Sequence, residues 1–283
     1  MTSIHWGGVP IDGGERFGED SIFVKNFFNK YIGDSRAECE ILFNLEAMPY
    51  IPRNHPAMAY RGNELTRTKF FFQDSADPDD TLVYKYTGIQ WRSTELYVHL
   101  RDWKNKNVCD MVDAFNANLS VNGESPGYNH VIGTKYKNER DGIGLHSDKT
   151  QSWTPESNVA ILSFGADRTF TITNLEGKVE QTFELSCGDL FLLGWKDNMK
   201  YKHGILAAKE PCGPRVSLCF RNIEEIWGKE QLTAKIEASD RARDQRAARK
   251  AEKKAAAEAE KAAAEVYVYA AQLADGVGVN LFL

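Results

Sequence analysis

Short runs of β-branched and aromatic residues, separated by Gly, Asn and Asp, occupy the chain from Tyr128 to Arg221. Runs of this length that are bounded by turn-forming residues predict β-strands. We expect strands at Val159–Phe164, Thr169–Thr173, Gln181–Leu185, Asp189–Leu193 and Val216–Phe220. Several short and evenly spaced strands are typical of a jelly roll or a barrel. The predicted core is therefore a double-stranded β-helix, which is the jelly-roll fold.

The residues before this β-rich region have mixed patterns. Ser21–Phe28 predicts a strand that runs into a turn. Ser35 and Glu38 have the spacing of a capping box, which predicts a helix over residues 36–43. Apolar residues between Thr94 and Asn118 recur near helical spacing and predict a second helix. The fold class is therefore α+β, with helices flanking the jelly-roll core.

The composition changes after Ile223. From Glu224 to Glu265 the chain is dominated by Ala, Lys, Arg and Glu, which favour a helix but provide almost no apolar stripe. We predict a domain over residues 1–223, with an N-terminal recognition part over about 20–127 and the catalytic core over about 128–223, and a charged tail over 224–283.

The tail predicts a helix or a partly disordered segment. Acidic residues are interleaved with its basic run, Arg246–Lys254, which favours a solvated helix over a nucleic-acid-binding arm. The segment from Val266 to Leu283 is apolar again and either docks back or pairs with a partner, and the sequence does not distinguish the two.

The bulk composition limits the class of protein. A hydrophobic fraction of 42% with 11% aromatic residues is that of a globular chain. No apolar run approaches the ~20 residues that cross a bilayer, so we expect no membrane contact. The first residues have no signal-peptide pattern, and the five cysteines include no C-x-x-C pair. This pattern favours reduced thiols in an intracellular protein of the cytoplasm or nucleus. The net charge of −5 argues weakly against nucleic-acid binding.

Two histidines and one aspartate provide candidate metal ligands. His146-Ser147-Asp148 is followed by His203, 57 residues after His146. Two imidazoles and one carboxylate are the set that holds non-haem Fe(II) on one face and leaves positions open for a co-substrate and O₂. In an extended segment His146 and Asp148 point to the same face. A surface loop with Asp148 as a cap is the alternative interpretation.

A second polar group lies on one predicted strand. Arg215, Ser217, Cys219 and Arg221 share one face if this run is extended, and Val216, Leu218 and Phe220 share the other. Two arginines that point into an apolar barrel are costly unless they pair with anions. A dicarboxylate co-substrate or an internal salt bridge would meet this requirement equally well.

These residues belong to a longer series of motifs. The series consists of Asn129–Tyr136, His146–Asp148, Ser163–Phe170, Gly188–Leu190, His203 and Arg215–Arg221. Together the motifs resemble the catalytic core of the AlkB-like Fe(II)/2-oxoglutarate dioxygenases. Upstream, 65–68 and 84–88 resemble the nucleotide-recognition segment of that family. The resemblance covers about 160 residues, as the motif positions show.

The resemblance implies roles for individual residues. His146, Asp148 and His203 would bind Fe(II) as the catalytic centre. Arg215 would hold the distal carboxylate of 2-oxoglutarate, and Arg221 would lie near its metal-bound end. The implied co-substrate site consists of Tyr136, Arg215, Ser217, Arg221 and Thr134. The implied substrate site consists of Tyr86, Arg67, Tyr84 and Thr150, where Tyr86 would stack on a flipped base.

The chain departs from the family where substrates are recognised. Thr134 replaces the Asn that DNA-repair members usually have, Thr150 replaces an acidic residue, and Phe70–Phe72 replaces a more polar stretch. The protein is also acidic where most DNA-repair members are basic. The cofactors implied are Fe(II), 2-oxoglutarate and O₂, and the substrate stays open.

Three functions are compatible with these patterns. The first is oxidative demethylation of N-alkylated DNA or RNA, as in DNA repair, releasing formaldehyde, succinate and CO₂ from a monomeric enzyme. The second is an oxygenase of the same fold that hydroxylates a C-methylated base, a protein side chain or a small metabolite. The third is a non-catalytic interaction protein, which the intact candidate ligands and both arginines disfavour.

Overall fold

The computed structural model describes residues 3–34, 48–51, 59–60, 63–64, 66–77, 79–84, 98–102 and 106–277. The chain divides into two compact units, Met1–Leu232 and Thr233–Leu283, which we describe separately.

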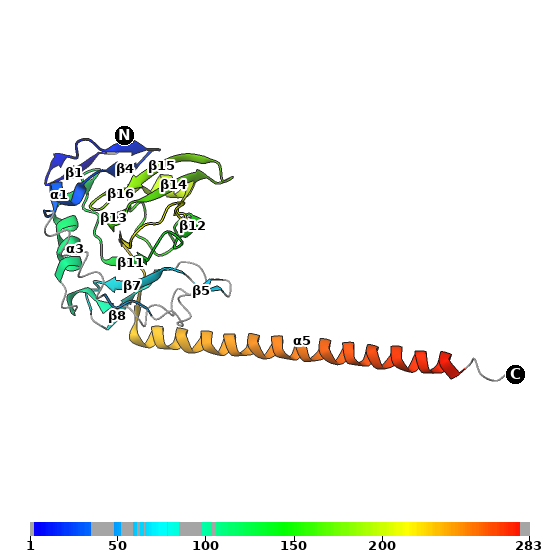
Figure 1. Ribbon diagram of the computed structural model, residues 1–283. Coiled ribbons are helices and arrows are strands. Elements are labelled where there is room, and N and C mark those ends of the chain that lie inside the picture. The colour runs from blue at the N-terminus through cyan, green and yellow to red at the C-terminus, as the bar shows by residue number, and fades with distance from the viewer. Residues whose placement is uncertain are drawn as a thin grey trace. The chain divides into compact units, whose positions relative to one another are not determined.

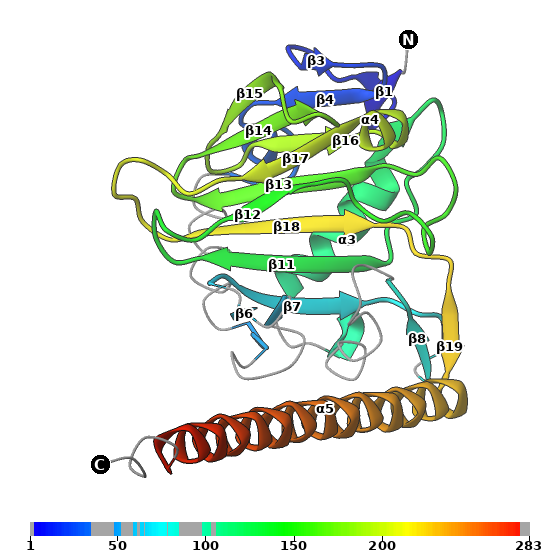
Figure 2. The same cartoon turned by 90° about the vertical axis from the view of Figure 1, so that its right-hand side faces the viewer.

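Two sheets form the framework of the first unit. The larger has eight strands in the order β3 (Glu15–Phe17), β4 (Ser21–Val24), β16 (Leu190–Leu193), β13 (Val159–Gly165), β18 (Arg215–Arg221), β11 (His130–Tyr136), β7 (Thr68–Gln73) and β9 (Val98–His99). The smaller consists of β12 (Ile143–His146), β17 (Tyr201–Ile205), β14 (Arg168–Asn174) and β15 (Val179–Leu185). Figure 2 shows the strands of the larger sheet one above the other.

The larger sheet has a hydrophobic core on each of its faces. Helices α1 (Phe27–Tyr31) and α3 (Lys106–Asn118) lie on one side of it, and the smaller sheet lies on the other (Figure 1). Alternate side chains of β18 point to one side of the sheet or the other, because successive side chains of a strand point to opposite faces. Val216, Leu218 and Phe220 pack against the helices, as predicted. Two sheets and flanking helices confirm the predicted α+β jelly-roll fold.

The predicted strands of the core are confirmed. Each of the five predicted runs corresponds to β13, β14, β15, β16 or β18, with ends that differ by one or two residues. β4 and the short helix α1 together account for the predicted strand and turn at Ser21–Phe28.

The predicted helix over Thr94–Asn118 is correct only in its second part. Helix α3 begins at Lys106, and Val108, Met111, Val112 and Phe115 of this helix are buried in the core. Val98–His99 instead forms the strand β9 and pairs in parallel with Phe72–Gln73, and a 3-10 turn, Leu100–Asp102, follows. An open sheet edge offers backbone hydrogen bonds to a β-branched residue, and this overrides the helical spacing. Residues 94–97 and 103–105, and the predicted helix over 36–43, lie outside the described residues.

The three phenylalanines of β7 belong to the cores. Phe70 and Phe72 pack on the helix side, and Phe71 packs between the sheets. A Cβ atom at Gly133 of the neighbouring β11 would lie 1.9 Å from the Phe70 ring, so only glycine fits beside this ring. None of the three lines the cavity described below. The replacement of the family's more polar stretch by these three phenylalanines therefore affects the packing of the cores and not the lining of the cavity.

Smaller elements complete the first unit. They are the sheet β10-β1-β2 (Leu119–Val121, Ile4–Trp6, Val9–Pro10), the pair β5-β6 (Ala59–Tyr60, Asn63–Glu64), the pair β19-β8 (Ile226–Gly228, Asp80–Leu82) and helix α4 (Trp195–Lys200). Because β19 pairs with β8, the residues directly after Ile223 still belong to the sheets.

Helix α5 (Lys229–Val277) contains 49 residues and forms nearly all of the second unit. It confirms the predicted helical tail. From Arg241 to Val266 every side chain is exposed. None of the helices in the described part of the chain combines the length and the apolarity that a membrane span requires.

Candidate metal and co-substrate site

A cavity of about 610 Å³ opens between the two sheets. Its size lies in the range of small-molecule sites. Ten of the predicted site residues line it, namely Arg67, Tyr84, Thr134, Tyr136, His146, Asp148, His203, Arg215, Ser217 and Arg221. Thr150 does not line the cavity, and Tyr86 lies outside the described residues.

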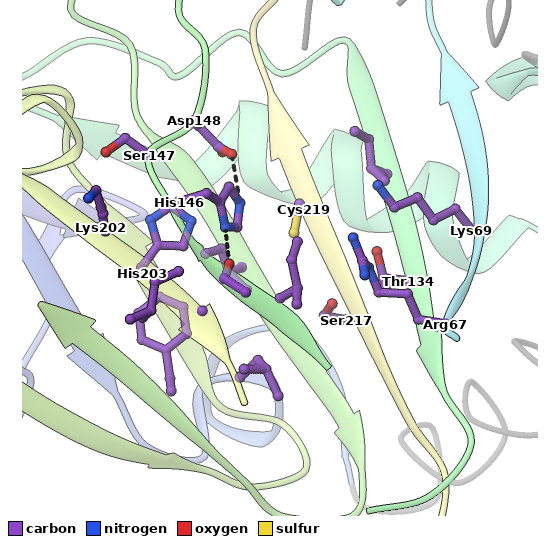
Figure 3. A pocket seen from close by; sticks show the side chains of 18 of the residues that line it. Arg67, Lys69, Thr134, His146, Ser147, Asp148, Lys202, His203, Ser217 and Cys219 are labelled. Atoms are coloured by element: carbon purple, nitrogen blue, oxygen red, sulfur yellow. Dashed lines mark hydrogen bonds and ion pairs between the residues drawn. The ribbon is translucent and has the colours of Figure 1, made fainter. Parts of the chain in front are cut away.

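His146, Asp148 and His203 converge at one end of this cavity (Figure 3). One potential ligand atom from each lies within 4.8 Å of the other two. The sequence separation is bridged by strand pairing, because His146 of β12 is the direct partner of His203 in β17. The two imidazole rings are 4.6 Å apart between centroids. Two nitrogen donors and one carboxylate on one side of an open cavity suit Fe(II).

Hydrogen bonds fix the orientation of this group. His146 Nδ1 lies 2.8 Å from the carbonyl oxygen of Gly144, and donation to it leaves Nε2 available to a metal. Ser147 Oγ donates to the Tyr201 carbonyl at 2.7 Å. The Asn198 amide of α4 accepts from the Asp148 N–H at 2.8 Å and donates to the Asp148 carbonyl at 3.0 Å. The loop that carries Asp148 is therefore held at several points.

Arg221 neutralises the Asp148 carboxylate. Its Nη2 donates to Asp148 Oδ2 at 2.6 Å, and both side chains are only 7% exposed. The guanidinium lies 4.9 Å from the Tyr84 ring centroid and 5.7 Å from that of Trp153. Burial alone would raise the pKa of the Asp148 carboxyl, but Arg221 and the two histidines outweigh burial and hold this pKa well below its usual value. Asp148 is thus ready as an anionic ligand.

Arg215 has the surroundings of a site for an anion. Its side chain is 1% exposed, and its Nη2 donates to Ser163 Oγ at 2.9 Å. Its Nε and Nη1 have no hydrogen-bond partner within the described part of the chain. Burial lowers the pKa of the Arg215 guanidinium and raises the pKa of the Tyr136 hydroxyl, whose ring centroid lies 5.2 Å from this guanidinium. A carboxylate that enters the cavity could accept from one of these buried nitrogens and from the second N–H of Nη2.

A basic wall lies across β18 from the histidines. Figure 3 shows Arg67, Lys69 and Thr134 on that side. Lys69 was absent from the predicted site, although it is 8% exposed and lines the cavity. Burial, and then the charges of Arg67 and Arg221, lower the pKa of Lys69 to about 7. The alternation of Lys69 with the core residues Phe70 and Phe72 was the signal in the sequence that could have identified it.

Two predicted substrate residues have other local contacts. Tyr84 is 2% exposed, and its ring is covered by Arg221 and lies 5.8 Å from the His130 ring. Tyr84 therefore supports Arg221 and has little ring surface left for a base. The carbonyl of Thr150 accepts the Trp153 N–H at 3.1 Å within a turn.

The geometry agrees with the comparison to known families. The model of the 2OG-Fe(II) oxygenase superfamily matches residues 26–221. The chain belongs to the 2OG-Fe(II) oxygenase superfamily. It is thus an enzyme of the dioxygenase class, and Fe(II), 2-oxoglutarate and O₂ are the cofactors of this class. The third sequence-based alternative, a non-catalytic interaction protein, is set aside.

The curated relatives of this oxygenase are AlkB-like, as the motifs predicted. The DNA oxidative demethylase ALKBH2 of Bos taurus is 26% identical over 174 residues, which are 58% of this chain and 60% of the relative. The Mus musculus protein of the same name is 30% identical over 153 residues, 51% of this chain and 59% of the relative. The chain thus spans about three fifths of the length of these relatives. Among solved structures, OsALKBH1 has a TM-score of 0.48 and 16% identity, covering 74% of this chain and 99% of its own.

The two buried histidines of the oxygenase predict a pH dependence of stability. Burial lowers the pKa of His130 and of His203 to about 3, whereas an unfolded histidine titrates near pH ~6.5. Below that pH the unfolded chain binds more protons than the native protein, so stability falls as the pH falls. For the metal-free protein in urea, we expect the free energy of unfolding to drop by about 1.4 kcal/mol per pH unit per histidine between pH ~6 and ~4.

The matched variant is His130→Phe, because this side chain is 0% exposed and faces the Phe71 and Tyr84 rings. It should remove about half of the slope contributed by the two histidines. A slope that is unchanged in His130→Phe would contradict the prediction.

Proposed function

We propose that this oxygenase removes a methyl group from a nitrogen of a nucleic-acid base. The N-methyl carbon takes one oxygen atom of O₂ and leaves as formaldehyde, and the other oxygen atom ends in succinate as 2-oxoglutarate loses CO₂. The observation that carries the proposal is the convergence of His146, Asp148 and His203 with the buried Arg215 in one cavity. A set of candidate metal ligands and a buried guanidinium in the same cavity would suit a dicarboxylate that binds the metal at one end.

His146, Asp148 and His203 would hold the iron, and the bound iron supplies the oxidising chemistry. The support comes from their ligand atoms within 4.8 Å of one another and from the low pKa of the Asp148 carboxyl. Arg221 would secure the ligand geometry, because its ion pair with Asp148 fixes one carboxylate oxygen and leaves the other toward His146, whose Nε2 is 3.4 Å away.

Arg215 would hold the carboxylate of 2-oxoglutarate that is distant from the metal. Each of the two nitrogens without a partner among the described residues borders a different edge of this guanidinium, so a carboxylate could accept from one of them together with the second N–H of Nη2. Tyr136, Thr134 and Ser217 line the same part of the cavity with hydroxyl groups. Ser217 lies between Thr134 and Ser163 on neighbouring strands. These residues would orient the co-substrate and exclude water from it.

The nucleic-acid substrate is supported by two observations. The curated relatives are named DNA oxidative demethylases. The cavity also has Arg67 and Lys69 on the wall across β18 from the histidines, where a phosphate or a base edge could be contacted. A methylated pairing edge is hidden in a duplex, so the base must be flipped out or come from a single strand.

A second candidate is an oxygenase of the same fold that hydroxylates another substrate. Lys69 favours it, because this buried amine is paired in register with Thr134, the position that is usually Asn in the DNA-repair members. An amine with a lowered pKa beside a threonine would present a different recognition surface to a substrate.

The metal assignment predicts the effect of Asp148→Asn. We expect at least a 100-fold loss of 2-oxoglutarate-dependent succinate formation, because a neutral amide is a poor ligand for a hard cation. Fe(II) binding, measured anaerobically by titration calorimetry, should weaken in parallel. Asp167→Asn, which changes an exposed side chain outside the cavity, is the control. Wild-type turnover in Asp148→Asn would exclude Asp148 as a ligand.

The co-substrate assignment predicts the effect of Arg215→Gln. Loss of a charge-assisted hydrogen-bonded pair costs about 2–3 kcal/mol, so the KM for 2-oxoglutarate should rise by about 30- to 150-fold. Initial rates of succinate formation across 2-oxoglutarate concentrations measure this, and Arg140→Gln at an exposed position is the control. An unchanged KM would show that Arg215 has a purely structural role.

The proposed substrate predicts the products of the reaction with methylated oligonucleotides. Incubation of the enzyme with N-methylated DNA and RNA oligonucleotides should release formaldehyde and restore the unmodified base, both measured by mass spectrometry. The Asp148→Asn protein is the control for background oxidation. Succinate formation with every oligonucleotide unchanged would reject the nucleic-acid substrate and favour the second candidate.

A further inference from the structure

Helix α5 carries a stripe of positive charge, which we call the basic stripe and define as Arg246, Arg249, Lys250 and Lys253. These positions are i, i+3, i+4 and i+7, which lie on one face of a helix. At ~100° per residue they cover an arc of roughly 100°, and at ~1.5 Å per residue they extend over about 10 Å. All four side chains are exposed.

The carboxylates of this segment lie on a different face. Asp244 and Glu252 are the acidic residues between Arg241 and Lys254. On a helical projection both fall outside the arc of the basic stripe. Glu252 lies roughly 110° and Asp244 roughly 170° from the centre of this arc. Neither carboxylate thus lies within the arc of the basic stripe, and Glu252 lies at its margin, three residues after Arg249. This arrangement supports the alternative interpretation of the sequence, a nucleic-acid-binding arm, because interleaving along the chain does not place the acidic residues within the basic stripe.

Ion pairing distinguishes the basic stripe from other cations of α5. Arg241 pairs with Glu237, Arg243 with Asp240 and Asp244, Lys254 with Glu258, and Lys261 with Glu265. No member of the basic stripe has a carboxylate within ion-pair distance among the residues that the structure describes. Four neighbouring charges that are not neutralised within the helix repel one another, and an external polyanion would relieve this repulsion.

We infer that the basic stripe of α5 binds the phosphate backbone of a nucleic acid. Arginine and lysine at this spacing can contact successive phosphates, and the released counterions contribute to the affinity. The contact has no base-edge readout, so it tethers a strand irrespective of sequence. The role as a tether for the substrate rests on the proposed function, whereas the binding site itself does not.

The composition of the helix favours nucleic acid over an anionic membrane. Apart from charged residues, the segment from Arg241 to Glu265 contains only alanine and one glutamine. Membrane-surface helices need large apolar side chains to insert below the headgroups. The chain as a whole has a net charge of −5, so a phosphate backbone requires a local basic surface such as this stripe.

The test uses the full chain and a fluorescent oligonucleotide without methylated bases. One variant changes the four residues of the basic stripe to Gln, which retains helix propensity. The matched control changes Arg241, Arg243, Lys254 and Lys261 to Gln, again two arginines and two lysines, but ion-paired ones. Anisotropy titrations at KCl concentrations from about 50 to 200 mM give the affinity and its salt dependence. Circular dichroism checks that both variants stay helical.

The stripe variant should lose at least tenfold in affinity at low salt, and the slope of log K against log[KCl] should fall by about 2 to 4 relative to wild type. The control should change much less. Equal losses in both variants, or wild-type binding by the stripe variant, would overturn the inference. Binding by the wild type to phosphatidylserine vesicles but not to the oligonucleotide would also overturn it.

The two proposals fail in different ways. Binding that depends on the basic stripe, in a protein that demethylates no oligonucleotide, supports the inference and rejects the proposed function. Demethylation of a methylated mononucleoside should be equal in wild type and stripe variant, because a mononucleoside has no backbone to tether. A loss of that activity in the stripe variant would contradict the tethering role.

Discussion

The ion pair between Arg221 and Asp148 is the interaction on which the cavity depends. Both side chains are buried, and their 2.6 Å contact supplies the charge balance that lets a carboxylate stay ionised in this interior. The pair joins β18 of the larger sheet to the loop after β12 of the smaller sheet. It thereby connects the two layers at the point where the candidate ligands meet. The rings of Tyr84 and Trp153 pack against the Arg221 guanidinium and help to hold it in place.

Other residues of the site either hold this ion pair in position or lie on the same strand as Arg221. Asn198 holds the backbone of Asp148 by both its N–H and its carbonyl. Helix α4 carries Asn198 and is itself tied to the turn before β4, because Asp197 accepts the N–H groups of residues 19–21. Arg215, at the other end of β18, has two buried nitrogens available to an anion. One strand thus provides a buried ion pair at one end and, at the other, a buried guanidinium with two nitrogens that have no partner among the described residues.

Much of the fold and of the candidate site follows from local patterns. The alternation in Arg215–Arg221 places two arginines on one face and three apolar residues on the other, and the structure has this arrangement. Local patterns failed where the conformation or the burial of a residue depends on a neighbouring strand. Val98 took a strand conformation because the edge of β7 was open to it. Alternation with Phe70 and Phe72 could have placed Lys69 on the opposite face of its strand, but its burial depends on strands β7 and β11 lying side by side.

The sequence by itself determined the class of chemistry, since the ligand types, their order and the motif spacing are properties of the chain. It also determined the strands of the core, because short β-branched and aromatic runs bounded by turn-forming residues are local signals. Tertiary structure alone decided that Arg221 pairs with Asp148, whereas Arg215 keeps two buried nitrogens without a partner among the described residues. It also decided the role of Tyr84, whose ring is covered. The sequence could not decide these points, because the burial of a side chain and its ion pairs depend on residues that are far apart in the chain and that the fold brings together.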